Sequence, residues 1–209
     1  MKVLVACEYS GKVRDAFIKA GHDAMSCDLL PSDSAYGPHY QGSVFDLDLS
    51  QFDLLIAHPP CTYLAVSGLH WNKRNPERAA QTEAALAFIQ RLWDAPCKMV
   101  CIENPVGCIN SRLSDMPRPQ YVQPYEFGHD ASKKTGLWTR GLPKLVPTER
   151  IQGRMVDDKE RFGNQTDSGQ NNLGPSPDRW KIRSTTYSGI AQAMADQWGG
   201  NTEQQTDAA

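Results

Sequence analysis

Two short segments of the chain carry residue types suited to covalent chemistry. Cys61 follows Pro59 and Pro60, directly after an apolar run. Glu103 and Asn104 follow a second apolar run in the same way. A thiol at a strand end can act as a nucleophile when local donors lower its pKa, and a nearby carboxylic acid can exchange a proton with a substrate. Cys61 could equally be a core cysteine at a rigid turn, and Glu103 a capping or solvated acid. Cys61 and Glu103 indicate covalent chemistry only if the fold brings the two side chains close together.

The first turn of the chain has the character of a nucleoside-binding segment. Glu8, Tyr9, Ser10 and Gly11 follow an initial apolar run, and Asp28 closes the next one. Glycine lets a ligand approach the backbone closely, and an acid at the end of a second strand is suited to bind a ribose diol. The turn lacks the Gly-x-Gly-x-x-Gly pattern, so it favours an adenosyl group over the pyrophosphate of a dinucleotide.

The segments around these residues alternate between strand and helix patterns. Strands are expected at residues 2–7, 23–28, 52–57 and 98–102, and helices at 13–22, 76–93 and 188–198. This order predicts an α/β fold with a doubly wound parallel sheet. Ligands of such sheets bind beyond the carboxyl ends of the strands, which is where the polar segments fall. We therefore expect Cys61, Glu103 and the first turn to share one edge of the sheet.

The remaining segments are poorer in core-forming residues. Residues 29–40 form a Pro/Ser/Gly-rich loop, and residues 123–141 have the character of a hairpin. Residues 151–177 are polar and rich in Gly, Asn, Gln and Pro, which predicts a mobile loop or a small insertion. The polar tail at residues 201–209 is expected to be disordered.

Composition and charge narrow the function classes. The 209 residues suit one domain, or one domain with a small appendage. A net charge of −2 argues against a binder that relies on bulk positive charge. No apolar run approaches the ~18 residues of a membrane span and no signal peptide is found, so we expect a cytoplasmic protein without membrane contact. Charge is uneven, because residues 111–184 hold 13 basic and 9 acidic side chains. This excess could meet a polyanion or form the solvated face of a loop.

The six cysteines do not form a metal or disulfide pattern. No two are spaced Cys-x-x-Cys, and without a secretion signal a disulfide framework is not expected. Cys97, Cys101 and Cys108 could be read as a zinc cluster, but buried reduced cysteine behaves as a small hydrophobe. We expect no metal.

Taken in order, these segments resemble the motifs of the DNA cytosine-5 methyltransferase family. The resembling segments are Tyr9-Ser10-Gly11, residues 20–28 (AGHDAMSCD), 53–68 (DLLIAHPPCTYLAVSG), 101–107 (CIENPVG), 127–141 (FGHDASKKTGLWTRG) and 186–195 (TYSGIAQAMA). The paired Pro-Pro-Cys and Glu-Asn-Pro at this separation are the most specific of them.

The resemblance implies a Rossmann-like, doubly wound fold that binds S-adenosylmethionine. Its catalytic domain would comprise residues 1–141 and 183–200, with residues 142–182 as a reduced target-recognition insertion. Compact chains of this kind resemble phage or prophage enzymes that modify DNA to evade host restriction, which would place the protein in the host cytoplasm. The expected partner is duplex or single-stranded DNA, and the expected state is a monomer.

The resemblance also implies roles for single residues. Cys61 would add to C6 of cytosine, Glu103 would assist at N3, and Asn104 would orient their loop. Lys133 or Lys134 would stand in for an arginine at the base O2. The cofactor would contact Glu8, Tyr9, Ser10, Gly11, Asp28, Leu29, Ser43, Val44, Asp46, Pro60, Ser188 and Gly189.

The chain departs from the family at several points. Thr62 replaces the glutamine that follows the catalytic cysteine, and the hairpin lacks its Gln-x-Arg-x-Arg pattern. The short insertion leaves two alternatives open. One is a C5 transferase acting on RNA or a free nucleotide, or using a modified donor. The other is a catalytically idle homologue that binds nucleic acid or S-adenosylmethionine. Trp180, near the end of the insertion, could stack on a base or anchor the loop.

Overall fold

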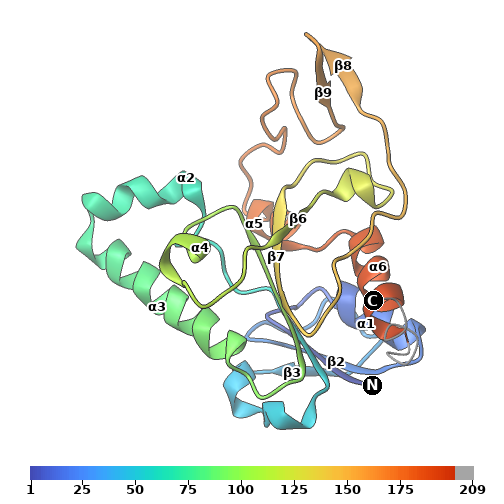
Figure 1. Ribbon diagram of the computed structural model, residues 1–209. Helices are drawn as coiled ribbons and strands as arrows, with labels where there is room; N and C mark the ends of the chain where they lie inside the picture. Colours follow the sequence, from blue (N-terminus) through green and yellow to red (C-terminus); the bar gives the residue numbers. More distant parts are fainter. Residues whose placement is uncertain (201–209) are drawn as a thin grey trace.

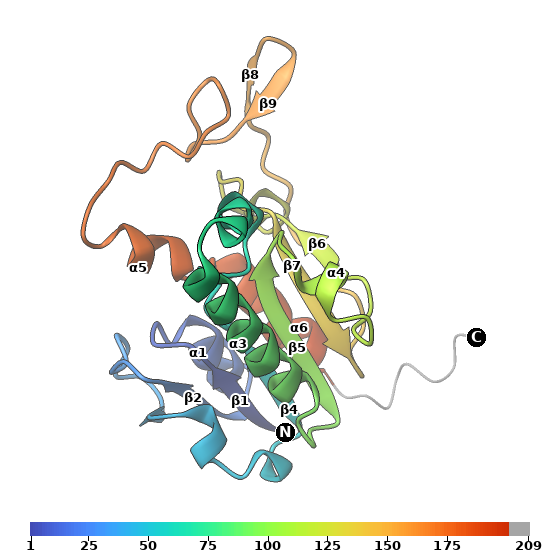
Figure 2. The same cartoon turned by 90° about the vertical axis from the view of Figure 1, so that its left-hand side faces the viewer.

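The core of the protein is a seven-stranded, mostly parallel sheet (Figures 1 and 2). The computed structural model describes residues 1–200, so the expected disorder of residues 201–209 lies outside the described residues. The strand order is β3-β2-β1-β4-β5-β7-β6, and only β7 runs antiparallel to its neighbours. The strands are β1 (Lys2–Ala6), β2 (Asp23–Asp28), β3 (His39–Gln41), β4 (Leu54–Ala57), β5 (Met99–Pro105), β6 (Gln120–Val122) and β7 (Thr135–Arg140). The predicted Rossmann-like α/β fold is confirmed.

Helices cover both faces of the sheet. Helix α3 (Pro76–Trp93) packs on one face, and α1 (Lys12–Lys19) and α6 (Ser188–Gly199) pack together on the other. Helix α3 begins as its sequence predicts, with the side chain of Asn75 accepting from the backbone N–H of Arg78 and a proline in the first turn. Burial on both faces explains why β4 reads as a continuous apolar run.

Short elements connect the main ones. They are the helices α2 (Val66–Leu69), α4 (Ile109–Arg112) and α5 (Arg179–Ser184), and the 3₁₀ helices η1 (Val44–Asp46), η2 (Leu49–Gln51), η3 (His70–Lys73) and η4 (Pro124–Glu126). A two-stranded ribbon of β8 (Arg154–Val156) and β9 (Lys159–Arg161) projects from the sheet domain (Figure 2). Among residues 1–200, no helix has both the length and the apolar character needed to cross a membrane.

The structure corrects three sequence-based boundaries. Strand β3 lies at the end of the predicted loop 29–40, where three residues pair with β2. The hairpin is built from β6 and β7, so its first strand precedes residue 123. The segment predicted as a loop at 151–177 contains the β8–β9 ribbon. All three involve strands of three residues, too short to show a periodic pattern.

Candidate active site

Three neighbouring strand ends bring the polar segments together. Strands β1, β4 and β5 are adjacent and parallel. Glu8 lies just after β1, His58 directly follows β4, and Glu103 lies in the last three residues of β5. His58 continues the β4 ladder, because its backbone N–H donates to the carbonyl of Ala6 at 3.0 Å. Cys61 follows three residues later. The sequence expectation that these segments share one edge of the sheet agrees with this arrangement.

The turn that carries Cys61 is held from two sides. The buried Asn104 side chain donates from Nδ2 to the carbonyl of Pro59 at 2.8 Å. On the far side of Cys61, the Arg78 guanidinium donates to the carbonyls of Thr62 at 2.8 Å and Gly68 at 3.2 Å. Asn104 from β5 and Arg78 from α3 therefore fix the backbone before and after the thiol.

The Cys61 side chain is exposed, unlike that of any other cysteine in the chain. Neighbouring atoms still desolvate its thiol, and this desolvation and the negative charge of Glu103 raise the pKa of Cys61. The charges of Lys133 and Arg183 act in the opposite direction. The thiol therefore remains protonated at neutral pH. The expectation that local donors lower its pKa was wrong for the protein without substrate, because desolvation and, next, the Glu103 carboxylate raise the pKa by more than the donors lower it.

Glu103 is held as a carboxylate. Its Oε2 lies 3.2 Å from Nδ1 of His58. Burial raises the pKa of Glu103, but the hydrogen bond with His58 and the positive charge of Lys133 outweigh burial, so the pKa is lowered overall. The sequence predicted a carboxylic acid that exchanges a proton with a substrate. Because His58 and Lys133 both face the group, it rests as the carboxylate, the form that accepts a proton.

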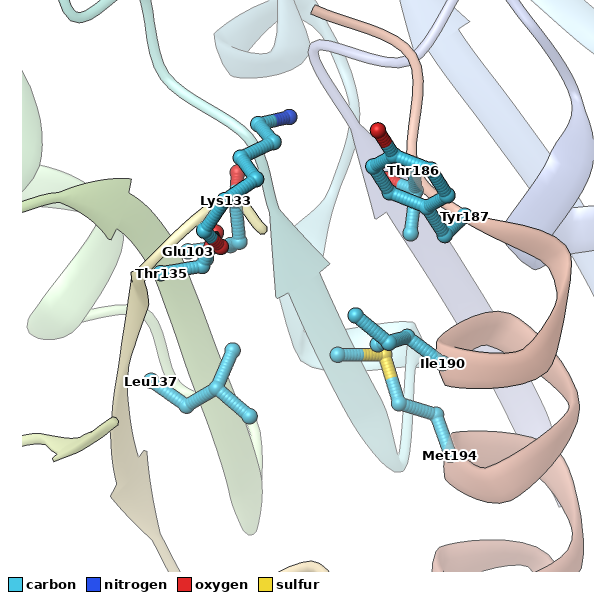
Figure 3. A pocket seen from close by; sticks show the side chains of 8 residues that line it. All are labelled: Glu103, Lys133, Thr135, Leu137, Thr186, Tyr187, Ile190 and Met194. Carbon is cyan, nitrogen blue, oxygen red and sulfur yellow. Dashed lines mark hydrogen bonds between the residues drawn. The ribbon is translucent and has the colours of Figure 1, made fainter. Parts of the chain in front are cut away.

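Glu103 opens onto a pocket between two walls (Figure 3). One wall comes from β5, β7 and the residues before β7, and the other from α6 and the residues before it. Lys133 extends over the mouth of this pocket, whereas the Lys134 ammonium lies 4.5 Å from the centre of the Tyr121 ring. The lining residues are Glu103, Lys133, Thr135, Leu137, Thr186, Tyr187, Ile190 and Met194. Of the two lysines considered for the base O2, only Lys133 faces the pocket.

The first turn is more tightly packed than its sequence predicts. The Glu8 carboxylate is buried and accepts from the backbone N–H groups of Val13 at 2.7 Å and Arg14 at 3.2 Å. It therefore caps α1, and it also accepts a hydrogen bond from the Ser10 hydroxyl at 3.3 Å. Gly11 has φ +70°, a conformation that disfavours side chains. Glu8 and Ser10 are thus engaged with the helix rather than open to a ligand.

Tyr9 is covered by α5. Its hydroxyl donates to the carbonyl of Lys181 at 2.9 Å and lies 3.0 Å from Oγ of Ser184. Its ring centre is 5.9 Å from that of Trp180, whose side chain remains 55% exposed. The short helix α5 therefore packs against the first turn.

The end of β2 offers open ligand-binding groups. Asp28 is half-buried, and its Oδ1 accepts from the N–H of Leu30 at 2.9 Å. Leu29 beside it is 74% exposed. Ser43 and Asp46 instead bond each other's backbone as the capping box of η1, and Val44 is part of the core. Asp28 and Leu29 are the more accessible members of the predicted cofactor set.

The remaining predicted cofactor residues lie at the margins of the site. Pro60 is exposed on the Cys61 turn. Ser188 and Gly189 begin α6, where Nε2 of His129 lies 2.9 Å from the Gly189 N–H and 3.3 Å from the Ser188 hydroxyl. A side chain at Gly189 would collide with the carbonyl of Phe127. These two residues therefore dock α6 against the segment before β7.

Comparison with solved structures gives two similar chains. One is a candidate DNA modification methyltransferase encoded within an Escherichia coli prophage, with 16% identity over 76% of this chain and 53% of that chain, at a TM-score of 0.49. The other is a mutant of DNMT2 from Spodoptera frugiperda, with 18% identity over 77% of this chain and 57% of that chain, at a TM-score of 0.45. This chain thus spans little more than half the length of either. No protein-family profile and no curated protein matches it.

Sequence reasoning missed three residues of the site. His58 stood in the sequence as a boundary of the strand, although a histidine beside Pro59 and Cys61 is itself a signal. Arg78 was assigned only to a helix, and its contact with the Cys61 segment depends on tertiary packing. Arg183 was counted only in the basic excess of residues 111–184, but its charge acts on Cys61. Within residues 1–200, no group of three or more potential metal-ligating side chains comes together.

Proposed function

We propose that this chain methylates C5 of cytosine in DNA, using S-adenosylmethionine and a transient bond from Cys61 to the base. The observation that carries the proposal is the pairing of an exposed thiol with an ionised carboxylate at adjacent strand ends. The two groups also follow one another in the motif order described above. A binding module would have no need of this pair.

The chemistry requires both groups. C5 of cytosine is too weak a nucleophile to attack a methyl sulfonium. Addition of the Cys61 sulfur at C6 turns the ring into an enamine, whose C5 can attack. The thiol proton passes to Glu103 and from there to N3, so the addition is balanced in charge. After methyl transfer a base removes the C5 proton, the sulfur–C6 bond breaks, and the N3 proton returns to Glu103.

The resting protonation states suit this sequence. A thiol with a raised pKa still holds the proton that N3 needs, and a carboxylate with a lowered pKa is ready to accept it. Lys133 and Arg183 place positive charge near the sulfur, which favours the thiolate once the proton has left. Lys133 also faces the pocket beside Glu103, where it can donate to a carbonyl oxygen of the base.

The residues at the end of β2 fit an adenosyl cofactor. Asp28 has one carboxylate oxygen bonded to the backbone, which leaves the other for a ribose diol. Leu29 supplies exposed apolar surface for a purine. When bound, S-adenosylmethionine would provide an electrophilic methyl group. Glu8 would act on this site indirectly, by holding the first turn of α1.

A covalent trap tests the proposal. Duplex DNA containing 5-fluorocytosine cannot lose its C5 substituent, so the adduct with Cys61 would accumulate when S-adenosylmethionine is present. We expect a shifted band on a denaturing gel with wild type and none with Cys61→Ser or without the cofactor. Trapping by Cys61→Ser equal to that of wild type would refute the covalent role of Cys61.

A further inference from the structure

A single buried histidine lies between the two carboxylates of the site. His58 stands at the end of β4, between Glu8 after β1 and Glu103 in β5. Its side chain is 7% exposed and that of Glu103 is 15% exposed. His58 also supplies the largest of the charge effects that lower the pKa of Glu8, although burial raises that pKa overall. The imidazole is thus placed inside the site rather than in the core.

The backbone at His58 is restrained on both sides. Its N–H belongs to the β4 ladder, and Pro59 and Pro60 follow it. A residue before proline is confined to extended conformations, and Asn104 fixes the carbonyl of Pro59. The imidazole therefore approaches Glu103 from a rigid element rather than from a loop.

The contacts of the ring define its tautomer. Nδ1 lies 3.2 Å from Oε2 of Glu103, and this carboxylate can only accept, so Nδ1 is the donor. Nε2 is buried and has no hydrogen-bond partner in the described part of the chain. The polar contact that the ring does make is therefore directed at the catalytic carboxylate.

We propose that His58 is a positioning residue for the proposed methyl transfer, holding Oε2 of Glu103 so that the other carboxylate oxygen is presented to the base. The inference rests on the proposed function, because only that function makes a cytosine base the partner of the Glu103 carboxylate. Lys133 faces the same carboxylate from the segment before β7. His58 sets the orientation of the group from the end of β4, and Lys133 adds positive charge from the segment before β7.

Two substitutions distinguish the contribution of the Nδ1 hydrogen-bond donor from that of the imidazole ring as a whole. In His58→Asn the amide nitrogen can occupy the position of Nδ1, whereas His58→Ala removes the donor. We expect His58→Ala to lower kcat about 10²-fold with KM for DNA within about threefold, since misplacement of a catalytic group costs this much. His58→Asn should recover most of kcat. His22→Ala is the matched control, because His22 is a half-buried histidine that precedes β2 at the opposite edge of the sheet.

The pH profile gives a readout that a purely structural role would not move. Loss of the Nδ1 donor raises the pKa of Glu103, so the acid limb of kcat should move to higher pH in His58→Ala and return in His58→Asn. His58 acts on Glu8 and Glu103, Lys133 also acts on Glu103, and Glu103 in turn acts on the Cys61 and Cys101 thiols. A ¹³C carboxyl titration of Glu103 in each variant therefore separates this group from the others. An unmoved Glu103 titration, or equal kcat in wild type and His58→Ala, would overturn the inference.

The two proposals can fail separately. Absence of methyl transfer by wild type would refute the proposed function, and with it the role of His58 toward a base. The carboxyl titration would then still show whether His58 holds Glu103, because it requires no substrate. Wild-type activity that is insensitive to His58→Ala would refute only the inference about His58. Thermal melting of each variant shows whether it is folded.

Discussion

At the scale of single residues, the reactivity of Cys61 is set by the charges around it. Desolvation and Glu103 raise the thiol pKa above its ordinary value of 9.0, and Lys133 and Arg183 oppose them. Glu103→Gln removes a negative charge and should lower the pH midpoint of alkylation by iodoacetamide. Lys133→Met removes a positive charge and should raise it. Mass spectrometry can follow the reaction at Cys61 alone, because it is the exposed cysteine.

The neighbouring lysine provides the control for this experiment. Lys134 lies over Tyr121, away from the pocket, so Lys134→Met should leave the midpoint within about 0.2 pH units. Equal shifts for the two lysine variants would mean that bulk charge, rather than the placement of Lys133, governs the thiol.

The individual residues also show where sequence reasoning reaches its limit. Cys61 and Glu103 could be chosen because residue type, flanking prolines and strand ends all point to them. Their protonation states could not be predicted, since each depends on the partner that the fold supplies. The neighbouring prolines and Cys61 mark His58 as a candidate, but its contact with Glu103 and the effect of Arg183 on Cys61 cannot be predicted from the sequence.

At the scale of elements, the start of α1 depends on Glu8. Its carboxylate accepts two backbone N–H groups that would otherwise be buried without partners. Glu8→Gln replaces one acceptor oxygen with a donor and should reduce the free energy of unfolding by about 1–2 kcal/mol. Urea denaturation measures this loss. Glu77→Gln is the matched control, an exposed glutamate in the first turn of α3, with an expected change below about 0.5 kcal/mol. A loss in Glu8→Gln no larger than in this control would show that the cap contributes little.

The segment that follows Cys61 depends on α3. Arg78 binds the carbonyls of Thr62 and Gly68, and its guanidinium lies 5.1 Å from the centre of the Tyr63 ring. Lysine keeps the charge but cannot reach both carbonyls in one plane. Arg78→Lys should therefore lower kcat about tenfold and hasten limited proteolysis between residues 62 and 74. Unchanged proteolysis together with reduced kcat would assign Arg78 a direct role with substrate instead.

Long elements were the predictable part of the fold. The boundaries of α3 agree with its proline, its alanine-rich turn and its apolar spacing, and β2 agrees at both ends. Strand β5 extends three residues beyond its apolar run, through Glu103 and Asn104, because it pairs with β7 as far as Pro105. That extension places Glu103 in the β5–β7 ladder instead of on a loop, and no local sequence pattern predicts it.

At the scale of the whole molecule, exposed basic side chains lie on two segments outside the seven-stranded sheet. Lys73 and Arg74 are exposed near η3, and Lys159 is exposed on β9. If DNA contacts both, log K for binding should fall linearly with log salt, with a slope of about −0.9 per neutralised phosphate. Lys159→Ala and Lys73→Ala should each reduce the slope by about one. Lys98→Ala, at the opposite edge of the sheet before β5, should leave it unchanged; an equal reduction there would contradict this placement of DNA.

The central claim is tested most directly by methyl transfer itself. Wild type and Cys61→Ala would be incubated with methyl-tritiated S-adenosylmethionine and duplex DNA, single-stranded DNA, RNA or dCMP. Nucleoside mass spectrometry would identify the product. We predict 5-methylcytosine in DNA with wild type and none with Cys61→Ala. Binding of S-adenosylmethionine without label in any acceptor, or equal labelling by Cys61→Ala, would contradict the account.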